Sequence, residues 1–518
     1  MSFFSGSTSA KPGNFQNAMG VQTYRASSSE SARPVPYLMG RQRIALTYIS
    51  DCFDTRTQHV GGGGKSSTRE GTNYYTSFAA LACFGPVDAL HAVFLNGDPV
   101  YTERTNIVII LLTSAAGVAT ATTRNEHNLT TGDSVVIVGA SQQEYVGTFV
   151  ITVTADNKFT FAITGTPQSP ATAPNNGKIY ARVVLPPIFR DEDNPDYVDI
   201  TIPDYGVMRL YWGTETQEPD DYLLSSGVDH PAYRGLCYAV FHRLYLGFNQ
   251  TNVQNIELVL GRYPERDWLE AEEINGDTGL ISLVADLLQS PRAGLRLPDE
   301  KIDTATMLET AATLADEGFG FSPLLTREQE TRQVIISALE YFDGYLSFTA
   351  DGKLGVKLVR PPVGALPEVT DTDLVEKPTF EPDDWSEAFN ETTVRFTNRS
   401  LDYKEDSVSR PDSGLRNITG EPKSQSLDRP WITDGATAEA LQRSAGRAGA
   451  LPQLTGTLKL RMDSELFDAL TPGEPFTLDY SGRNTDQLIF RVVTRTVQDP
   501  ARPVFEIQFK ADRSYVYA

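Results

Sequence analysis

The chain has 518 residues, of which 40% are hydrophobic, and its 45 basic against 67 acidic residues give a formal net charge of −22. This length exceeds what one hydrophobic core supports, so we expect roughly three to five domains in a β-rich or mixed soluble protein. The acidic balance disfavours stable nucleic-acid binding, which needs clustered Lys and Arg. It favours high solubility, or a surface past which DNA slides without adhering.

The chain offers few signs of a membrane, secretory or redox role. Its longest apolar run, residues 107–112, is far shorter than the roughly 20 residues that cross a bilayer. The N-terminus lacks the basic start and apolar stretch of a secretory signal, so we expect synthesis in a cytoplasm. Cys52, Cys83 and Cys237 show no CxxC spacing. They predict neither a disulfide framework nor a metal site, and we expect small buried side chains.

The first half of the chain is predicted to be mostly β. Residues 1–35, rich in Ser, Gly and Ala, indicate an N-terminal arm. Residues 36–105 and 181–262 contain strand-like runs and are predicted to form a first β-barrel with an adjoining β-domain. Between them, residues 106–180 change to Thr, Val, Ala and Gly with short strands and turn residues. This block predicts a small inserted β-domain.

Residues 263–366 are predicted to form a mixed α/β domain. Apolar residues at helical spacing start at Leu280 and end before Pro291. A second helix follows Asp303 as N-cap, with Gly318 at its C-terminal end. Thr326 and Gln329 suit a capping box for a third helix. After it, two strand-like runs flank an Asp-Gly turn at residues 351–352, which predicts a hairpin.

Residues 367–518 are predicted to form a C-terminal β-barrel domain. Val394 and Phe396 indicate a strand, and the polar stretch 403–428 is interpreted as a long exposed connection. A helix is expected at about residues 437–449. The end of the chain alternates apolar and polar residues in several runs, which suits a closed or nearly closed barrel.

A search for catalytic or ligand-binding patterns gives no candidate. The glycine-rich stretch 61–67 lacks the first glycine of a phosphate-binding loop, because His59 occupies that position. The five histidines are not spaced as helical metal ligands. The acidic cluster Asp191-Glu-Asp193, with Asp196 and Asp199, departs from the calcium-loop spacing. We therefore expect no catalytic residue, no metal and no cofactor.

One segment resembles a known family. Residues 230–247 read HPAYRGLCYAVFHRLYLG, and residues 255–259 read NIELV. They resemble the Tyr-Arg-Gly strand, the Leu-x-Leu-Gly continuation and the return strand of the tail-tip attachment and baseplate hub family of lambda-like phages and gene transfer agents. The family-motif residues are Tyr233, Arg234, Gly235, Leu244, Leu246 and Gly247. On physical grounds they predict a buried strand, a turn and a paired return strand.

A later segment, Leu470-Thr-Pro-Gly473, is similar to the family's entry into a second barrel, with Pro472 and Gly473 as motif residues and Glu474 in place of the usual Asp. The resemblance covers roughly residues 36–105 and 181–510. We therefore expect neither the receptor-binding extensions of some relatives nor the glycosidase-like domain of others.

The resemblance implies a non-enzymatic structural hub in a phage tail tip or baseplate within the virion. It implies a homotrimer that joins the hexameric tail tube to the three-fold tip and lines the DNA exit channel. The implied partners are distal tail and tail tube proteins, the tape measure protein and tail-tip or fibre proteins. Phage DNA would pass transiently, and contact with the host cell surface is possible. Three alternatives stay open: a receptor- or glycan-binding tail adhesin, a tail-associated cell-wall hydrolase, and a multidomain binding protein unrelated to phages.

Overall fold

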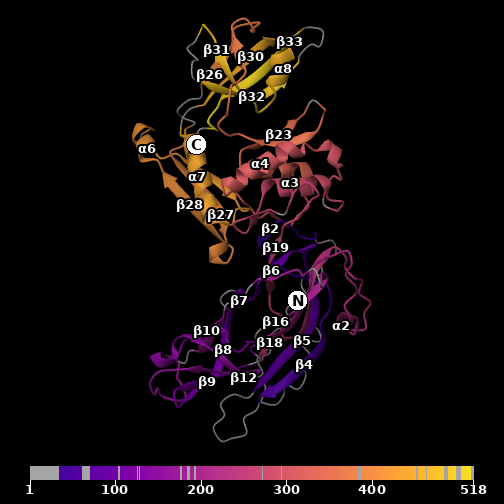
Figure 1. Cartoon of the computed structure of the whole chain (residues 1–518), viewed down its shortest axis with the longest axis vertical. Coiled ribbons are helices and arrows are strands. Elements are labelled where there is room, and N and C mark those ends of the chain that lie inside the picture. Colours follow the sequence, from indigo (N-terminus) through magenta and orange to yellow (C-terminus); the bar gives the residue numbers. More distant parts are fainter. Residues whose placement is uncertain are drawn as a thin grey trace, which may run out of the picture. The chain divides into compact units, whose positions relative to one another are not determined.

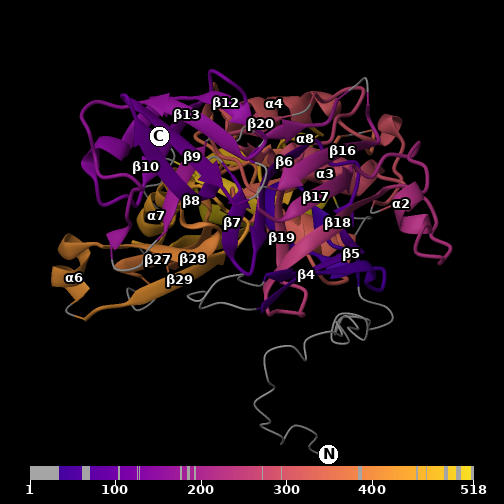
Figure 2. The same cartoon turned by 90° about the horizontal axis from the view of Figure 1, so that it is seen from below.

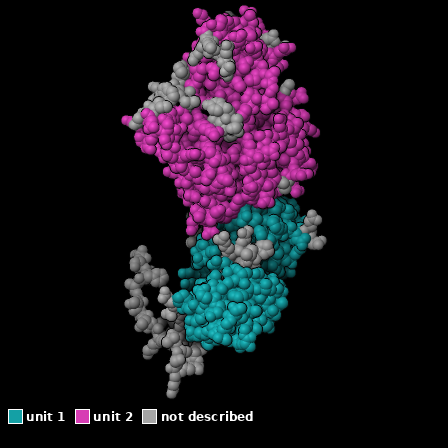
Figure 3. Space-filling model, turned by 60° about the vertical axis from the view of Figure 1, so that its left-hand side comes forward, with its two compact units in different colours: residues 1–262, 325–327 teal, residues 263–324, 328–518 magenta. Residues whose placement is uncertain are grey.

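The computed structural model divides the chain into two compact units, residues 1–262 with 325–327, and residues 263–324 with 328–518 (Figure 3). The predicted arm lies outside the described residues up to residue 33, as does the whole glycine-rich stretch 61–67. The structure describes residues 34–514 apart from 61–70, 103–104, 125–126, 128, 175–177, 184–186, 192–193, 203, 271, 293, 350, 383–387, 420, 451–452, 463, 483–487 and 498–502.

Two antiparallel sheets carry the family-like part of the first unit (Figure 1). The six-stranded sheet has the order β16-β17-β18-β5-β3, with β4 also on β5; its strands are β16 (Tyr197–Ile202), β17 (Gly206–Tyr211), β18 (Leu236–Phe248), β5 (Gly71–Phe84), β3 (Thr47–Tyr48) and β4 (Phe53–Val60). The five-stranded sheet has the order β15-β6-β19-β2, with β7 on β6; its strands are β15 (Ile188–Phe189), β6 (Ala89–Leu95), β19 (Ile256–Arg262), β2 (Gly40–Ala45) and β7 (Asp98–Tyr101).

A seven-stranded antiparallel sheet lies between these strands in sequence. Its order is β11-β10-β14-β8-β9-β13-β12, formed by Gly147–Val150, Ser134–Val138, Ile179–Val183, Thr105–Ala115, Val118–Thr123, Lys158–Ala162 and Thr152–Ala155. The two edge strands, β11 and β12, follow each other directly in the chain. Alternate residues of β9 face the hydrophobic core of this sheet. Ala119 and Ala121 point into that core, while Thr120 and Thr122 on the opposite face are half-buried.

The second unit begins with three helices and a hairpin, as the sequence predicts (Figure 1). The elements are α3 (Leu280–Gln289), α4 (Thr304–Asp316), α5 (Thr331–Leu339), β23 (Gly344–Phe348) and β24 (Leu354–Leu358). The Asp303 side chain caps α4 by accepting from the Thr306 amide. The predicted capping box is wrong, because α5 starts at Thr331 after Glu330, which makes no side-chain cap. The apolar face beginning at Val334 sets the start of this helix.

The C-terminal strands form a six-stranded sheet with the order β25-β31-β32-β33-β30-β26. These strands are Glu368–Thr370, Pro475–Asp479, Ile489–Thr496, Val504–Ala511, Leu454–Arg461 and Thr379–Pro382, and α8 (Ser464–Ala469) precedes β31. The alternating apolar residues point into one core, whose largest members are Phe476, Phe490, Phe505 and Phe509.

The stretch 403–428 is not a connection, contrary to our interpretation. It contains β28 (Lys404–Pro411), α6 (Ser413–Thr419) and most of β29 (Ser424–Arg429), and the two strands flank β27 (Glu391–Asn398) in one sheet (Figure 2). The predicted helix is confirmed as α7 (Gly435–Gly449), which packs on β27. Because β27 supplies most of the buried apolar side chains, its neighbours carry polar sequences that conceal their strands.

The predicted class, multidomain and β-rich with a mixed α/β section, is confirmed, including a nearly closed barrel and a half-barrel. The domain boundaries given above stay predictions. Among the described residues no helix is long and apolar enough to cross a membrane.

Candidate functional site

The Tyr233-Arg-Gly235 motif forms a tight turn, and our prediction of a strand there is wrong. Tyr233 and Gly235 have φ values of 49° and 73°, and the Leu236 amide donates to the Tyr233 carbonyl at 3.0 Å. β18 starts only at Leu236. The Gly235 carbonyl accepts from the Gly85 amide at 2.9 Å, so the turn is bound to the end of β5. Gly235 meets its positive φ without the cost of a Cβ atom.

The Gln217 side chain fixes this turn by hydrogen bonds, and the sequence pattern does not predict this residue. Its fully buried side chain donates from Nε2 to the carbonyls of Ala232 and Tyr233, at 2.9 and 2.7 Å, and its Oε1 accepts from Gly213. Arg234 turns outward and donates to the Gln217 carbonyl. A buried glutamine of this kind leaves no signal in one sequence, because glutamine is most often a surface residue.

Stacked tyrosines extend from the turn into the sheet. The Tyr238 ring lies 5.1 Å from that of Tyr233 and stacks on Tyr211 at 4.5 Å with an interplanar angle of 3°. The Tyr211 hydroxyl donates to Asp220, which also caps the short helix α2 (Asp221–Leu224). Burial, reinforced by the Asp220 carboxylate, raises the pKa of Tyr211. A high phenol pKa keeps this group neutral, which suits packing and hydrogen bonding.

The end of β18 also differs from our expectation. Leu244 and Leu246 are buried as predicted, and Gly247 has a φ of 133°. However, β18 pairs with β17 and β5, whereas β19 pairs with β2 and β6. The predicted return strand therefore lies in another sheet, and the intervening residues cross between the two sheets. Gln254 supports this crossing by donating to the Leu246 carbonyl at 3.0 Å.

The second motif, Pro472-Gly473, forms the turn between α8 and β31. Gly473 has a φ of 93°, and a Cβ atom there would lie 2.1 Å from the Tyr345 ring of the hairpin. The Gly473 carbonyl accepts from Arg491 at 2.9 Å. Glu474, which replaces the family's usual Asp, pairs with Lys357 of the hairpin. The motif thus joins the β23–β24 hairpin to the six-stranded sheet.

Arg491 is the centre of this junction. Its guanidinium forms an ion pair with Asp512 at 3.0 Å, with side-chain exposures of 4% and 3%, and also donates to the Arg360 carbonyl. A buried pair in which all three guanidinium nitrogens donate hydrogen bonds fixes geometry more than it adds stability. A cavity of about 600 Å³ adjoins the junction, lined in part by Thr310, Tyr345 and the chain segment 360–363.

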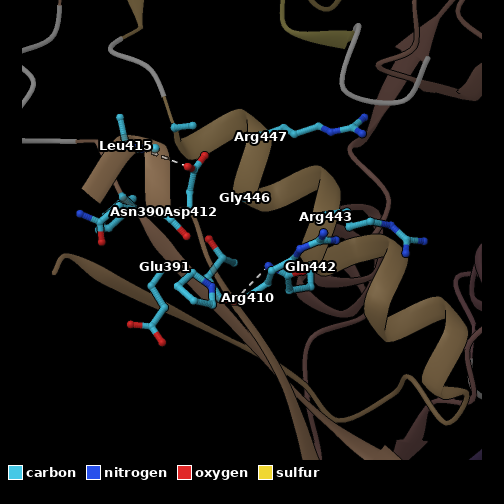
Figure 4. A pocket seen from close by; sticks show the side chains of 15 residues that line it. Asn390, Glu391, Arg410, Asp412, Leu415, Gln442, Arg443, Gly446 and Arg447 are labelled. Carbon is cyan, nitrogen blue, oxygen red and sulfur yellow. Dashed lines mark hydrogen bonds between the residues drawn. The ribbon is translucent and has the colours of Figure 1, made fainter. Parts of the chain in front are cut away.

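A second cavity, of about 810 Å³, lies between α6, α7 and the adjoining ends of β27 and β28 (Figure 4). The buried Gln442 side chain forms part of its wall and donates to the Thr392 carbonyl at 3.2 Å. We call it the arginine cleft; it is lined by Phe389, Asn390, Glu391, Thr392, Arg410, Pro411, Asp412, Ser413, Gly414, Leu415, Gln442, Arg443, Gly446, Arg447 and Ala450.

The remaining candidates do not converge on a reactive site. Cys83 and Cys237 lie opposite each other on β5 and β18, and burial raises the pKa of Cys237. Asp196 accepts hydrogen bonds from two threonines and Asp199 pairs with Arg209. Asp191 is exposed, and residues 192 and 193 of the same acidic cluster are outside the described residues. Within the described part of the chain, no three His, Cys, Asp or Glu residues gather as a metal site.

Comparison with known proteins gives a match by structure only. No family model and no curated relative matches the sequence. A chain from the virion of the native gene transfer agent particle superimposes with a TM-score of 0.52 at 13% identity, covering 95% of this chain and 88% of that one. The two chains share a fold. The resemblance found in the sequence is thereby confirmed at the level of the fold.

Two further solved structures match less closely. A tail protein from Neisseria meningitidis gives a TM-score of 0.32 at 10% identity, with 83% of this chain and 98% of that chain covered. A prophage tail protein of 43 kDa from Shewanella oneidensis gives 0.28 at the same identity and coverage.

Proposed function

We propose that the chain is a structural subunit of a phage-type tail, located in the tail tip or baseplate of a virion. The observation that carries this proposal is the shared fold with a chain of the gene transfer agent virion, which extends over 95% of this chain. A likeness along nearly the whole length includes both compact units rather than one shared domain. This analogy at the level of the fold supports the same kind of assembly role.

Within that role, we propose that three copies form a ring that joins the hexameric tail tube to the three-fold tip. A closed ring of identical subunits needs a self-consistent rotation at each contact, and three-fold symmetry satisfies it. The partners would be tail tube, distal tail, tape measure and tip proteins. The net charge of −22 suits a ring whose inner surface lets DNA pass without adhering.

The local geometry suits a structural part of an assembly. Both motifs lie at turns with positive φ that are bound by buried side chains, Gln217 at Tyr233 and Arg491 at Gly473. Such turns hold neighbouring strands in fixed positions and present no group poised for reaction. They support a scaffold over a catalyst.

The test is deletion of the gene from the genome that encodes it. A tail-tip subunit predicts filled heads and no gene transfer or infection, both restored by the wild-type chain supplied in trans. Normal transfer by the deletion strain contradicts the proposal.

The alternatives give different outcomes. An adhesin predicts assembled tails that fail to bind host cells when residues 106–180 are removed. A hydrolase predicts clearing on a cell-wall zymogram by the purified chain.

A further inference from the structure

The arginine cleft has a charge balance opposite to that of the chain. Its lining contains three arginines, Arg410, Arg443 and Arg447, and two carboxylates, Glu391 and Asp412. The whole chain has 45 basic against 67 acidic residues. All three arginines are exposed residues, so a partner can reach them from outside. The cleft is a local positive site on a negative protein.

Both carboxylates are already engaged by neighbours. The Glu391 carboxylate accepts from the Ser409 hydroxyl at 3.2 Å and from the Ser424 hydroxyl at 3.1 Å. Asp412 accepts from the Leu415 amide at 3.0 Å at the start of α6. In Figure 4 the Asp412 carboxylate points to that amide. These hydrogen bonds fix the two acids, which therefore act as framework for the cleft.

Arg443 is weakly held. Its guanidinium lies 3.8 Å from Glu439, and both side chains are about half exposed, at 48% and 60%. An exposed pair of this length contributes little. Arg443 and Arg447 lie four residues apart on α7, so they project along one side of the helix, and Arg410 enters from β28. Guanidinium groups bind carboxylates through two parallel hydrogen bonds, which gives directional recognition.

We propose that the arginine cleft docks a carboxylate-bearing segment of a second copy of this chain. The charge complementarity is with the chain itself, since an excess of 22 negative charges makes another copy a rich source of carboxylates. A contact between a cleft on one copy and a different surface on the next is heterologous. Contacts of this type close into a ring when the rotation from one copy to the next is a whole fraction of a turn. The inference rests on the proposed ring and names the contact that builds it.

The test compares charge reversals in the full chain. In one variant Arg410, Arg443 and Arg447 become Glu. In the control Arg332, Arg395 and Arg461, which are also exposed and in the same unit but outside the cleft, become Glu. Sedimentation velocity at about 50 mM and about 500 mM salt then shows how much of the association depends on charge, because the higher salt screens interactions between exposed charges. We expect the wild type and the control to form the same oligomer at low salt, and the cleft variant to associate at least ~10-fold more weakly.

Three outcomes overturn the inference: a wild-type chain that remains monomeric at low salt, a cleft variant that associates like the control, or a control that loses association equally. A hexaglutamate peptide serves as a probe for an acidic partner other than a second copy of the chain. If the cleft variant loses this peptide but keeps its oligomer, the occupant is not a second copy. Gene transfer by the deletion strain is measured separately, so a failed cleft contact leaves the tail role standing.

Discussion

The six-stranded and three-stranded sheets of the second unit differ in what holds them together. The six-stranded sheet buries aromatic side chains from three of its strands, including Phe476, Phe490 and Phe509. The three-stranded sheet buries chiefly one face of β27, at Thr392, Val394 and Phe396, while β28 and β29 are mostly polar and half-buried or exposed. The first sheet makes its own core, whereas the second depends on α7. The alternation of apolar and polar residues in the sequence therefore predicts the strands of the six-stranded sheet but not β28 and β29 of the three-stranded sheet.

The largest expected effect is loss of an aromatic side chain from the six-stranded sheet. Phe509 is 1% exposed and contacts Phe380, Phe476 and Phe490. Phe509→Ala should lower the free energy of unfolding by ~3–5 kcal/mol, since it leaves a cavity in a closed core. The control in the other sheet is Val408→Ala, where removal of two half-exposed methyl groups should cost at most about 1 kcal/mol. Chemical denaturation of both variants measures the contrast, and equal losses would remove the distinction between the sheets.

The next effect concerns the buried ion pair that joins β32 to the residue after β33 in the six-stranded sheet. Asp512→Ala leaves the Arg491 guanidinium buried without its carboxylate and should cost about 3 kcal/mol. The exposed pair of Lys459 and Glu376 is the control, and Lys459→Ala should leave the stability nearly unchanged. Thermal unfolding compares them. A loss for Asp512→Ala as small as that of the control would mean that the junction is not held by this pair.

A comparison of two glycine substitutions measures the contact between the hairpin and the six-stranded sheet. Gly473→Ala combines a positive φ with a clash against Tyr345 and should cost about 1–3 kcal/mol more than the control. The control is Gly352→Ala, which has a φ of 75° and nothing within 4 Å of its Cβ position. Both variants bear the backbone cost, so their difference in unfolding free energy reports the contact alone. Equal unfolding free energies would show that the Tyr345 ring moves aside without cost, which would contradict a tight contact.

The smallest effect is a pH dependence in the three-stranded sheet. A hydrogen bond from Asn398, with the Ser407 amide, holds the pKa of Asp406 below its usual value. The charged form is therefore favoured in the folded state. Its contribution is present above the unfolded pKa and is lost as the pH falls through the lower folded pKa. Asp406→Asn should flatten this part of the stability profile below about pH 4, and an unchanged acid limb would contradict the assignment.

The sequence predicts elements whose own residues carry the pattern. The helix after Asp303, the hairpin at 351–352 and the helix ending at Gly449 all show their caps, turns or periodicity locally. Strands β28 and β29 do not, because their stability comes from β27 and α7 across the chain. The same limit applies to the motif turn at Tyr233, where the left-handed conformation depends on Gln217, sixteen residues earlier.

For the candidate site, the sequence predicts which glycines matter but not what they contact. The family resemblance names Gly473, whereas its partners Arg491 and Tyr345 come from a later strand and an earlier hairpin. The arginine cleft has no local signal, because its cations come from β28 and α7 and meet only after folding.

The central claim is a structural place at the tail tip, and imaging of intact particles by electron cryomicroscopy tests it most directly. The account predicts density at the tail tip into which each unit fits as its own rigid body, repeated three times around the tail axis. Particles whose tail tip shows no density for this chain, or in which the chain occupies the capsid, would contradict it.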